Sequence, residues 1–211
     1  MAEKCVFFDL DGTLTDSGEG IIKCAALALE HFGLPVPDDQ TMREFVGPPL
    51  GDTFRRFGVP ADKVDEAITA YRSRYLTVGK FENFPYPHIS QVLKVLRERG
   101  CRLFVATSKP ETTSVEILEH FGLAGYFEII AGATFDGSRS SKADVIAYLL
   151  SRIGEVSQAT MVGDTAFDVL GAKAHGIPTV GVAWGYGKVD AMRDAGAIAI
   201  ADTPESLLAL L

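Results

Sequence analysis

Six short apolar runs, each separated from the next by longer segments of helical periodicity, limit most strongly how this chain can fold. Runs of this length, rich in β-branched and aromatic residues, are typical of strands buried on both faces. Strands that alternate with helices predict an α/β fold built on a doubly wound parallel sheet. The expected strands are residues 4–8, 102–106, 127–131, 159–162, 178–182 and 197–200.

Residues 16–87 contain no convincing strand and keep the spacing of helices. Their apolar residues recur at helical intervals in two stretches, Ile21, Ile22, Ala25, Leu29 and Phe32, then Val64, Ala67, Ile68, Tyr71 and Tyr75. A helical block inserted directly after the first strand predicts a second domain joined by two connections. We expect a core of residues 1–15 and 88–211 and an all-helical domain of residues 16–87, which would act as a lid.

The chain is acidic, with a formal net charge of -8. This charge disfavours nucleic acids and anionic membrane surfaces as partners. No apolar run approaches the ~20 residues that span a bilayer, and the first residues lack the features of a signal peptide. Three cysteines far apart in the sequence are typical of reduced thiols, so we expect a cytoplasmic protein.

Polar residues gather directly after the expected strands. In an open parallel sheet these carboxyl ends meet at one crevice, where ligands bind. The residues concerned are Asp9 and Asp11 after the first strand, Thr107, Ser108 and Lys109 after the second, and Gly163, Asp164 and Asp168 after the fourth.

Asp9 and Asp11 start on the same side of an extended chain, so they supply a nucleophile and a neighbouring acid. Attack of a carboxylate on phosphorus would form an acyl phosphate and divide hydrolysis into two easier steps. The backbone of Leu10 and Gly12 turns between the two acids, and a glycine lets the backbone approach a phosphate closely. A lone Asp-x-Asp-Gly is more typical of a capped turn than of a catalytic site. The polar residues that follow the other strands make the catalytic interpretation the favoured one.

Several carboxylates in one crevice would repel each other without a cation. Oxygen ligands beside a phosphate indicate Mg2+, with Asp9, Asp164, Asp168 and the backbone near Asp11 as candidate ligands. A hydroxyl and a lysine stabilise a transferred phosphoryl group. Thr107, Ser108 and Lys142 suit that task, with Lys109 as the alternative lysine; two serines before Lys142 are typical of a helix start.

The segments 9–16, 106–110, 142 and 163–168 resemble the four ordered motifs of the haloacid dehalogenase superfamily. Residues 16–17, 107–110 and 181–187 are similar to its phosphoglycolate-phosphatase-like branch. The resemblance implies a Rossmann-like core with a helical cap. It also implies that Asp9 is the nucleophile, Asp11 the general acid and base, Thr107 and Lys142 the phosphate holders and Asp164 the metal ligand. Asp168 would orient Lys142 or a metal-bound water.

These observations predict a magnesium-dependent phosphatase that hydrolyses a small phosphorylated metabolite, such as a phosphoglycolate-like compound, a nucleotide or a sugar phosphate. Asp11 argues against a dehalogenase, because a halide leaving group needs no proton. A phosphomutase of the same superfamily and a phospho-accepting signalling module are the alternatives. Arg43, close to residues 47–50 in the helical insertion, is the candidate substrate contact of that domain.

Overall fold

The computed structural model describes residues 4–154 and 156–211. The chain divides into two compact units, one made of residues 4–15 and 85–211 and one of residues 16–84. The expected return to the core at residue 88 lies close to the observed division between Phe84 and Pro85. In the part of the chain that the structure describes, no helix combines the length and apolarity needed to cross a membrane.

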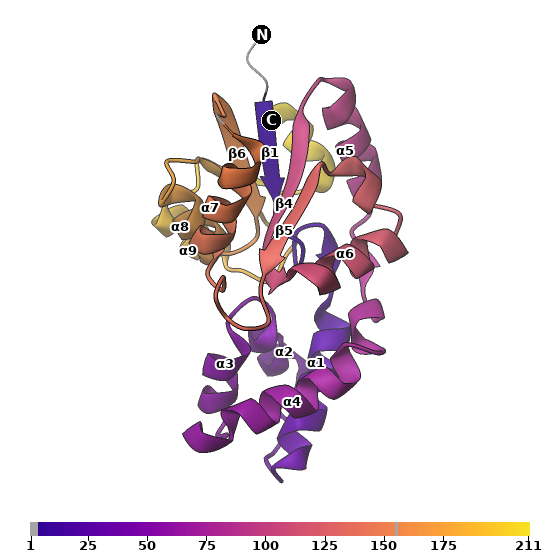
Figure 1. Cartoon of the computed structure of the whole chain (residues 1–211), viewed down its shortest axis with the longest axis vertical. Helices are drawn as coiled ribbons and strands as arrows, with labels where there is room; N and C mark the ends of the chain where they lie inside the picture. Colours follow the sequence, from indigo (N-terminus) through magenta and orange to yellow (C-terminus); the bar gives the residue numbers. More distant parts are fainter. Residues whose placement is uncertain (1–3, 155) are drawn as a thin grey trace. The chain divides into compact units, whose positions relative to one another are not determined.

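The first unit contains a six-stranded sheet in the order β5-β4-β1-β6-β7-β8. Figure 1 labels β5, β4, β1 and β6 of this sheet. Its strand pairs are parallel, as the alternation of strands and helices predicts. All six expected runs form strands, although several boundaries shift by a few residues. The strands are β1 Lys4–Phe8, β4 Arg102–Pro110, β5 Ile129–Ala133, β6 Gln158–Gly163, β7 Thr179–Val182 and β8 Ala199–Ala201.

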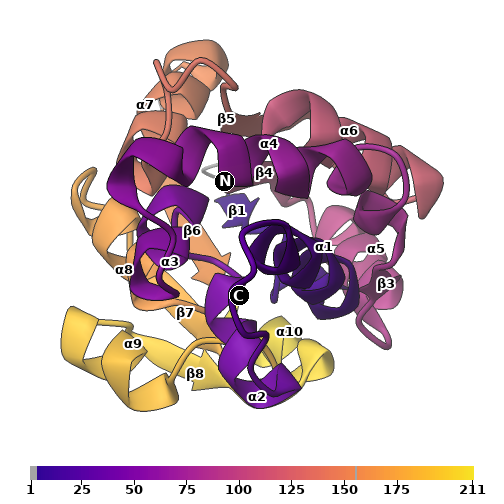
Figure 2. The same cartoon turned by 90° about the horizontal axis from the view of Figure 1, so that it is seen from below.

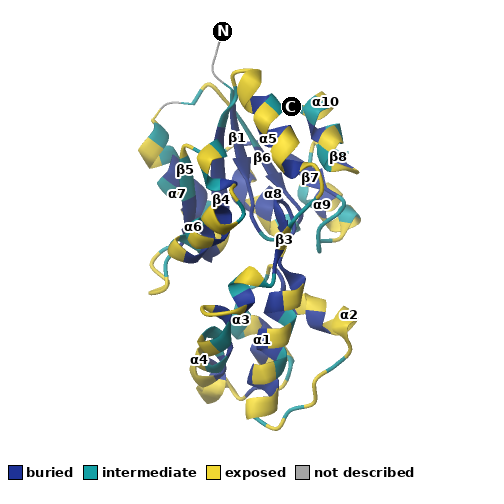
Figure 3. Cartoon of the chain, turned by 90° about the vertical axis from the view of Figure 1, so that its right-hand side faces the viewer, coloured by how far each residue is buried: buried dark blue, intermediate teal, exposed yellow. Residues whose placement is uncertain are grey.

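Alternate side chains of each strand enter opposite faces of the sheet, because successive residues of a strand point to opposite sides. On β1, Val6 and Phe8 belong to one hydrophobic cluster, which includes residues of α5, α6 and α10. Phe7 belongs to the other, with residues of α7 and α8. Figure 2 shows these helices on the two sides of the strands, and Figure 3 shows the strands buried between them.

Helices connect the strands of this unit and present their apolar stripes to the sheet. Such a stripe is buried on α5, at Ile89 and Leu93, and on α7, at Val145 and Leu149. The helices are α5 Ile89–Glu98, α6 Glu111–His120, α7 Lys142–Ile153, α8 Ala166–Lys173, α9 Val189–Ala195 and α10 Leu207–Leu210, with 3-10 turns η4 Ala124–Tyr126 and η5 Pro204–Ser206.

Strand β1 lies at the point where the order of the sheet reverses, between β4 and β6. From β1 the chain builds the sheet in one direction through β4 and β5, and later in the other through β6, β7 and β8. Such a switch point leaves a crevice at the carboxyl ends of the central strands. The fold therefore brings the ends of β1, β4 and β6 together.

The second unit, residues 16–84, consists of helices, as its periodicity predicts. They are α1 Gly18–His31, α2 Asp39–Met42, α3 Leu50–Arg56 and α4 Val64–Tyr75, with 3-10 turns η1 Arg43–Phe45, η2 Ala61–Lys63 and η3 Gly79–Phe81. Two strands of two residues, β2 Thr15–Asp16 and β3 Phe84–Pro85, pair where the chain passes between the units. The sequence predicted no strand there, because two residues are too few to show a period of two.

Within this unit, η3 packs closely on α1. A Cβ on Gly20 would overlap the carbonyl of Gly79, so the two backbones are in direct contact. Arg74 of α4 pairs with Glu82 through two nitrogen–oxygen contacts of 2.5 and 2.8 Å. This ion pair lowers the pKa of Glu82 to about 2, chiefly through its hydrogen bond with Arg74. The segment that leaves the helical unit is thus fixed to α4 by charge.

Candidate active site

Asp9 follows the last residue of β1 and stands at the switch point of the sheet. Its backbone N–H donates to the carbonyl of Val162 at 2.9 Å, which continues the pairing of β1 with β6. The residue is 8% exposed. Burial raises the pKa of Asp9 to about 6; Lys142 opposes this shift, and Asp168 and Asp11 add to it. Asp9 is therefore a buried carboxylate with one cation beside it.

Lys142 supplies that cation. Its Nζ lies 2.7 Å from Asp9 Oδ1 and 2.7 Å from Asp168 Oδ1, and it donates to the carbonyl of Ala106 at 2.9 Å. Burial alone would lower the pKa of this ammonium, but the charges of Asp168 and Asp9 outweigh burial and raise it. The lysine is thus held in its charged form between two carboxylates.

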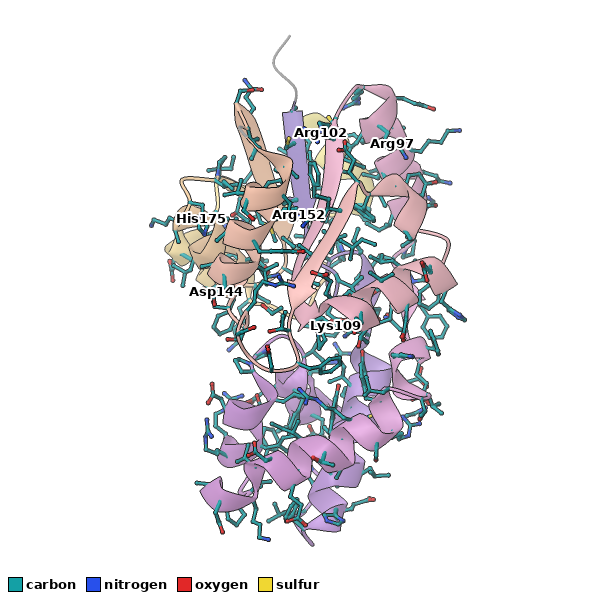
Figure 4. The ribbon with its side chains drawn as sticks, in the orientation of Figure 1. Arg97, Arg102, Lys109, Asp144, Arg152 and His175 are labelled. Atoms are coloured by element: carbon teal, nitrogen blue, oxygen red, sulfur yellow. The ribbon has the colours of Figure 1, made fainter. Side chains whose placement is uncertain are left out.

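The helix start that carries Lys142 is capped as the two serines predict. The Ser141 hydroxyl accepts from the backbone N–H of Asp144 at 3.1 Å, and the Asp144 carboxylate accepts from the backbone N–H of Ser141 at 3.1 Å. Figure 4 labels Asp144 on α7. This reciprocal capping box satisfies two backbone donors and fixes the direction of the first turn. It places Lys142 at the first position of α7.

Asp164 follows β6 and is held on both carboxylate oxygens. Its Oδ2 accepts from the backbone N–H groups of Tyr186 at 2.8 Å and Gly187 at 3.4 Å. Its Oδ1 accepts from the Thr13 hydroxyl at 3.4 Å. Burial raises the pKa of Asp164 to about 8, and the charges of Asp168 and Asp9 add to that shift. The contacts from residues 186 and 187 were not predicted, because backbone donors leave no side-chain signal in a sequence.

Asp168 lies on the first turn of α8 and is fully buried. Its Oδ2 accepts from the backbone N–H of Thr165 at 3.0 Å and from the Thr165 hydroxyl at 2.8 Å. Its other oxygen, Oδ1, is the one that faces Lys142. One carboxylate thus caps its own helix and orients Lys142, the lysine of the preceding motif.

Asp9, Asp164 and Asp168 form a group whose ligand oxygens lie within 4.8 Å of one another. All three are buried, and Lys142 is the cation paired with two of them, so three carboxyl groups face one ammonium. Such a group is stabilised by a hard divalent cation, and carboxylate oxygens are the ligands that Mg2+ prefers. The residues present therefore fit a magnesium ion.

Asp11 and Lys109 form a second ion pair beside this group. The Lys109 ammonium lies 2.9 and 2.7 Å from the two carboxylate oxygens of Asp11. Both side chains are largely buried, and Figure 4 labels Lys109. The sequence did not predict this pair, because its members are 98 positions apart. The carboxylate of Asp11 lies outside the three-acid group and faces a lysine. The backbone near Asp11 stays the predicted metal ligand of this turn.

Thr107 and Ser108 lie in the second half of β4 and differ in burial. Thr107 is 1% exposed, and its hydroxyl oxygen accepts from the backbone N–H of Lys109 at 3.2 Å. Ser108 is exposed. Since the acceptor side of the Thr107 hydroxyl is used, its hydrogen remains available to a phosphate oxygen.

The turn between the two aspartates leaves only its backbone for a ligand. The Leu10 side chain is fully buried in the hydrophobic cluster on one face of the sheet, so only its main chain can serve as the expected phosphate contact. Gly12 has φ +79°, and a Cβ there would overlap the carboxylate of Asp164. Glycine is required at this position by both conformation and space.

Arg43, the expected substrate contact of the helical domain, lies in the second unit on η1 and is exposed. The residues that the first unit brings together are Asp9, Asp11, Thr107, Lys142, Asp164 and Asp168, with Lys109 in addition. The role of Arg43 stays a prediction.

Comparison with known proteins gives a family and several relatives. A model described as haloacid dehalogenase-like hydrolase matches residues 6–182. The tyrosine-protein kinase PtkA of Mycobacterium tuberculosis is 49% identical over 188 residues, which cover 89% of this chain and 64% of the kinase. A 5'-nucleotidase of Pseudomonas aeruginosa is 38% identical over 190 residues, 89% of this chain and 86% of the nucleotidase. The crystal structure of a predicted phosphatase from Clostridium acetobutylicum superposes with a TM-score of 0.94 at 39% identity, covering 100% of both chains.

Proposed function

Because the chain belongs to the haloacid dehalogenase-like hydrolase family, we propose that it is a magnesium-dependent phosphatase that hydrolyses a small phosphomonoester through an aspartyl-phosphate on Asp9. The observation that carries this proposal is the buried group of Asp9, Asp164 and Asp168 around the ammonium of Lys142. A structural salt bridge would need one carboxylate for one lysine. Three carboxylates suit a site that receives a cation together with an anionic substrate.

In the first step Asp9 attacks phosphorus. The bond from phosphorus to the ester oxygen breaks as a bond forms between phosphorus and a carboxylate oxygen of Asp9. Asp11, which must enter this step protonated, gives its proton to the leaving oxygen. The Lys142 ammonium and the Thr107 hydroxyl bind the phosphoryl oxygens, on which negative charge develops. The main chain of Leu10 and Gly12 is a further candidate contact of the phosphoryl group, and so is Ser108.

In the second step Asp11, now a carboxylate, takes a proton from water, and the water oxygen attacks the phosphorus of the acyl phosphate. Phosphate leaves and the Asp9 carboxylate is restored. A magnesium ion held by Asp9 and Asp164, with Asp168 bound directly or through water, would neutralise charge on the carboxylates and the phosphoryl oxygens. The Lys109 ammonium lies 2.9 and 2.7 Å from the two carboxylate oxygens of Asp11 and so fixes Asp11 beside this group.

The proposed substrate is a small phosphorylated metabolite, either phosphoglycolate-like, a nucleotide or a sugar phosphate. The similarity to a 5'-nucleotidase supports the nucleotide class, and the helical unit with Arg43 would select among the leaving groups. We propose a cytoplasmic location for the chain, because three cysteines far apart in the sequence are typical of reduced thiols and the net charge is negative.

One observation favours a second candidate function, phosphoryl transfer to tyrosine. The relative PtkA is named a tyrosine-protein kinase and is 49% identical, although this chain spans only 64% of its length. An acyl phosphate on Asp9 could pass its phosphoryl group to a phenol oxygen instead of water, with a nucleoside triphosphate as the donor. The two functions differ in the phosphoryl donor and in the acceptor.

The decisive experiment measures phosphate release from a panel of small phosphomonoesters with Mg2+ and with chelator. We expect turnover only with Mg2+, and loss of at least about 1,000-fold in Asp9→Asn, because the nucleophile is removed. Lys94→Met, an exposed lysine of α5, is the control and should keep full activity. Phosphate release that persists in Asp9→Asn would refute the mechanism. Radiolabel from ATP found on tyrosine, with no ester hydrolysed, would favour the kinase.

A further inference from the structure

The segment Trp184-Gly185-Tyr186-Gly187, called here the 184–187 segment, follows β7 and lies against Asp164. Two of its backbone N–H groups donate to Asp164 Oδ2, from Tyr186 and from Gly187. A Cβ on Gly185 would overlap the Asp164 side chain, and one on Gly187 would overlap the Asp164 carbonyl. The segment therefore touches Asp164 along its side chain and its main chain, and both glycines are needed for that approach.

Trp184 links the segment to the turn after β1. Its indole Nε1–H donates to the carbonyl of Thr13 at 3.1 Å, and the hydroxyl of Thr13 donates to Asp164 Oδ1 at 3.4 Å. The contacts thus close a ring from Asp164 through Thr13 to Trp184, and back through the 184–187 segment to Asp164. Each carboxylate oxygen of Asp164 is held by a group that connects to Trp184.

The indole is itself held in place. It is half-buried against the hydrophobic cluster that contains Phe8 and Val182. The ring of Tyr86 contacts it edge-on, with centroids 6.3 Å apart and an interplanar angle of 66°. A side chain packed in this way can fix the polar groups that it binds, whereas an exposed one could not.

We propose that Trp184 is a positioning residue for Asp164, whose indole N–H fixes Thr13 and the 184–187 segment and so sets the affinity of the site for Mg2+. A ligand carboxylate that is already oriented by hydrogen bonds binds a metal more tightly than one that must be ordered on binding. The inference rests on the proposed function only in taking Asp164 as a magnesium ligand. It adds a residue that acts on Asp164 through Thr13 and the 184–187 segment.

The test compares Mg2+ binding by calorimetry in the chelator-treated full chain and in Trp184→Phe. Phenylalanine keeps an aromatic ring for the hydrophobic cluster but has no N–H. We expect the dissociation constant for Mg2+ to rise about 5-fold, less than the roughly 10- to 100-fold that is typical when a direct partner of a ligand is lost. Tyr126→Phe is the matched control, because Tyr126 packs on the same cluster and should leave Mg2+ affinity unchanged.

Thermal unfolding separates positioning from a merely structural role. A ligand that binds only the folded state raises Tm by an amount that depends on its concentration relative to Kd. Loss of packing alone would lower Tm equally with and without Mg2+. Loss of positioning makes the Mg2+-dependent increase in Tm smaller than in the unaltered chain, and this is the result that we expect for Trp184→Phe.

A second measurement needs no variant of Trp184. The chain contains one tryptophan, so its intrinsic emission reports this indole. We expect a saturable change of emission as Mg2+ is added, with the midpoint that calorimetry gives, and no change in Asp164→Asn.

Two results would overturn the inference while leaving the phosphatase proposal intact. One is an unaltered Mg2+ dissociation constant in a folded Trp184→Phe variant, and the other is constant emission while calorimetry records binding. Absence of Mg2+ binding to the unaltered chain would overturn both proposals, because the metal itself would then be missing from the function.

Discussion

At the scale of single residues, the candidate site concentrates charge of one sign. Asp9, Asp164 and Asp168 are buried within reach of one another, and Lys142 is the cation that pairs with two of them. Functional sites often cost a protein stability, and removing one of three mutually repelling carboxylates relieves part of that cost.

Asp9→Asn should therefore be more stable than the unaltered chain when Mg2+ is removed, by about 1 kcal/mol in free energy of unfolding. The order should reverse at saturating Mg2+, because the ion stabilises only the chain that binds it tightly. Urea unfolding at pH 7 with chelator and with Mg2+ measures both values. Asp190→Asn, an exposed aspartate of α9, should change neither. If Asp9→Asn were less stable in chelator too, repulsion would not govern this group.

At the scale of elements, the Arg74–Glu82 pair joins α4 to the segment that follows η3. The pKa of Glu82 is lowered to about 2, so its ionised form is favoured in the folded chain. A carboxyl group with a lowered folded pKa stabilises the protein above its ordinary pKa of 4.5, and that stabilisation is lost as pH falls toward 2.

Glu82→Gln should accordingly lower the free energy of unfolding at pH 6 by about 1 kcal/mol, since the pair is partly exposed to solvent. The difference from the unaltered chain should shrink when both are measured at pH 3. Urea titrations at the two pH values give the comparison. Glu98→Gln removes an exposed carboxylate that pairs loosely with Lys94 at 3.9 Å, and it should show no such dependence. A deficit that stays the same at pH 3 would show that charge is not the cause.

Helices and strands could be predicted where their burial leaves a hydrophobic pattern in the sequence. Contacts between segments far apart in the chain could not be predicted. The six strands were found because each contains a short apolar run, the pattern of strands buried in a parallel sheet. The strands β2 and β3 were missed because two residues carry no period. The positions of Asp9 and Asp164 followed from the strand ends, and that of Lys142 from a helix start. The Lys109–Asp11 pair and the amides of Tyr186 and Gly187 depend on distant segments that only the folded chain brings together.

At the scale of the whole molecule, the three acids of the candidate site all belong to one of the two compact units. Binding of Mg2+ should slow amide hydrogen exchange in β1, β6 and the 184–187 segment, because a ligand stabilises the region that holds it. Amides of α4, in the other unit, should change much less. Exchange measured by mass spectrometry with chelator and with Mg2+ makes the comparison. Equal slowing in both units would mean that they open together and would contradict this prediction.

The central position of β1 in the sheet has a consequence for the order in which the chain acquires its structure during translation. A ribosome makes β1 before any other strand, yet its two neighbours, β4 and β6, begin at Arg102 and Gln158. The helical unit of residues 16–84 has its own internal contacts and emerges complete while β1 is still unpaired. Contacts so distant in sequence form slowly. The nascent chain thus carries an unpaired apolar strand at least until β4 has been made, and the nucleophile at the end of that strand is the first part of the site to be made and among the last to be enclosed.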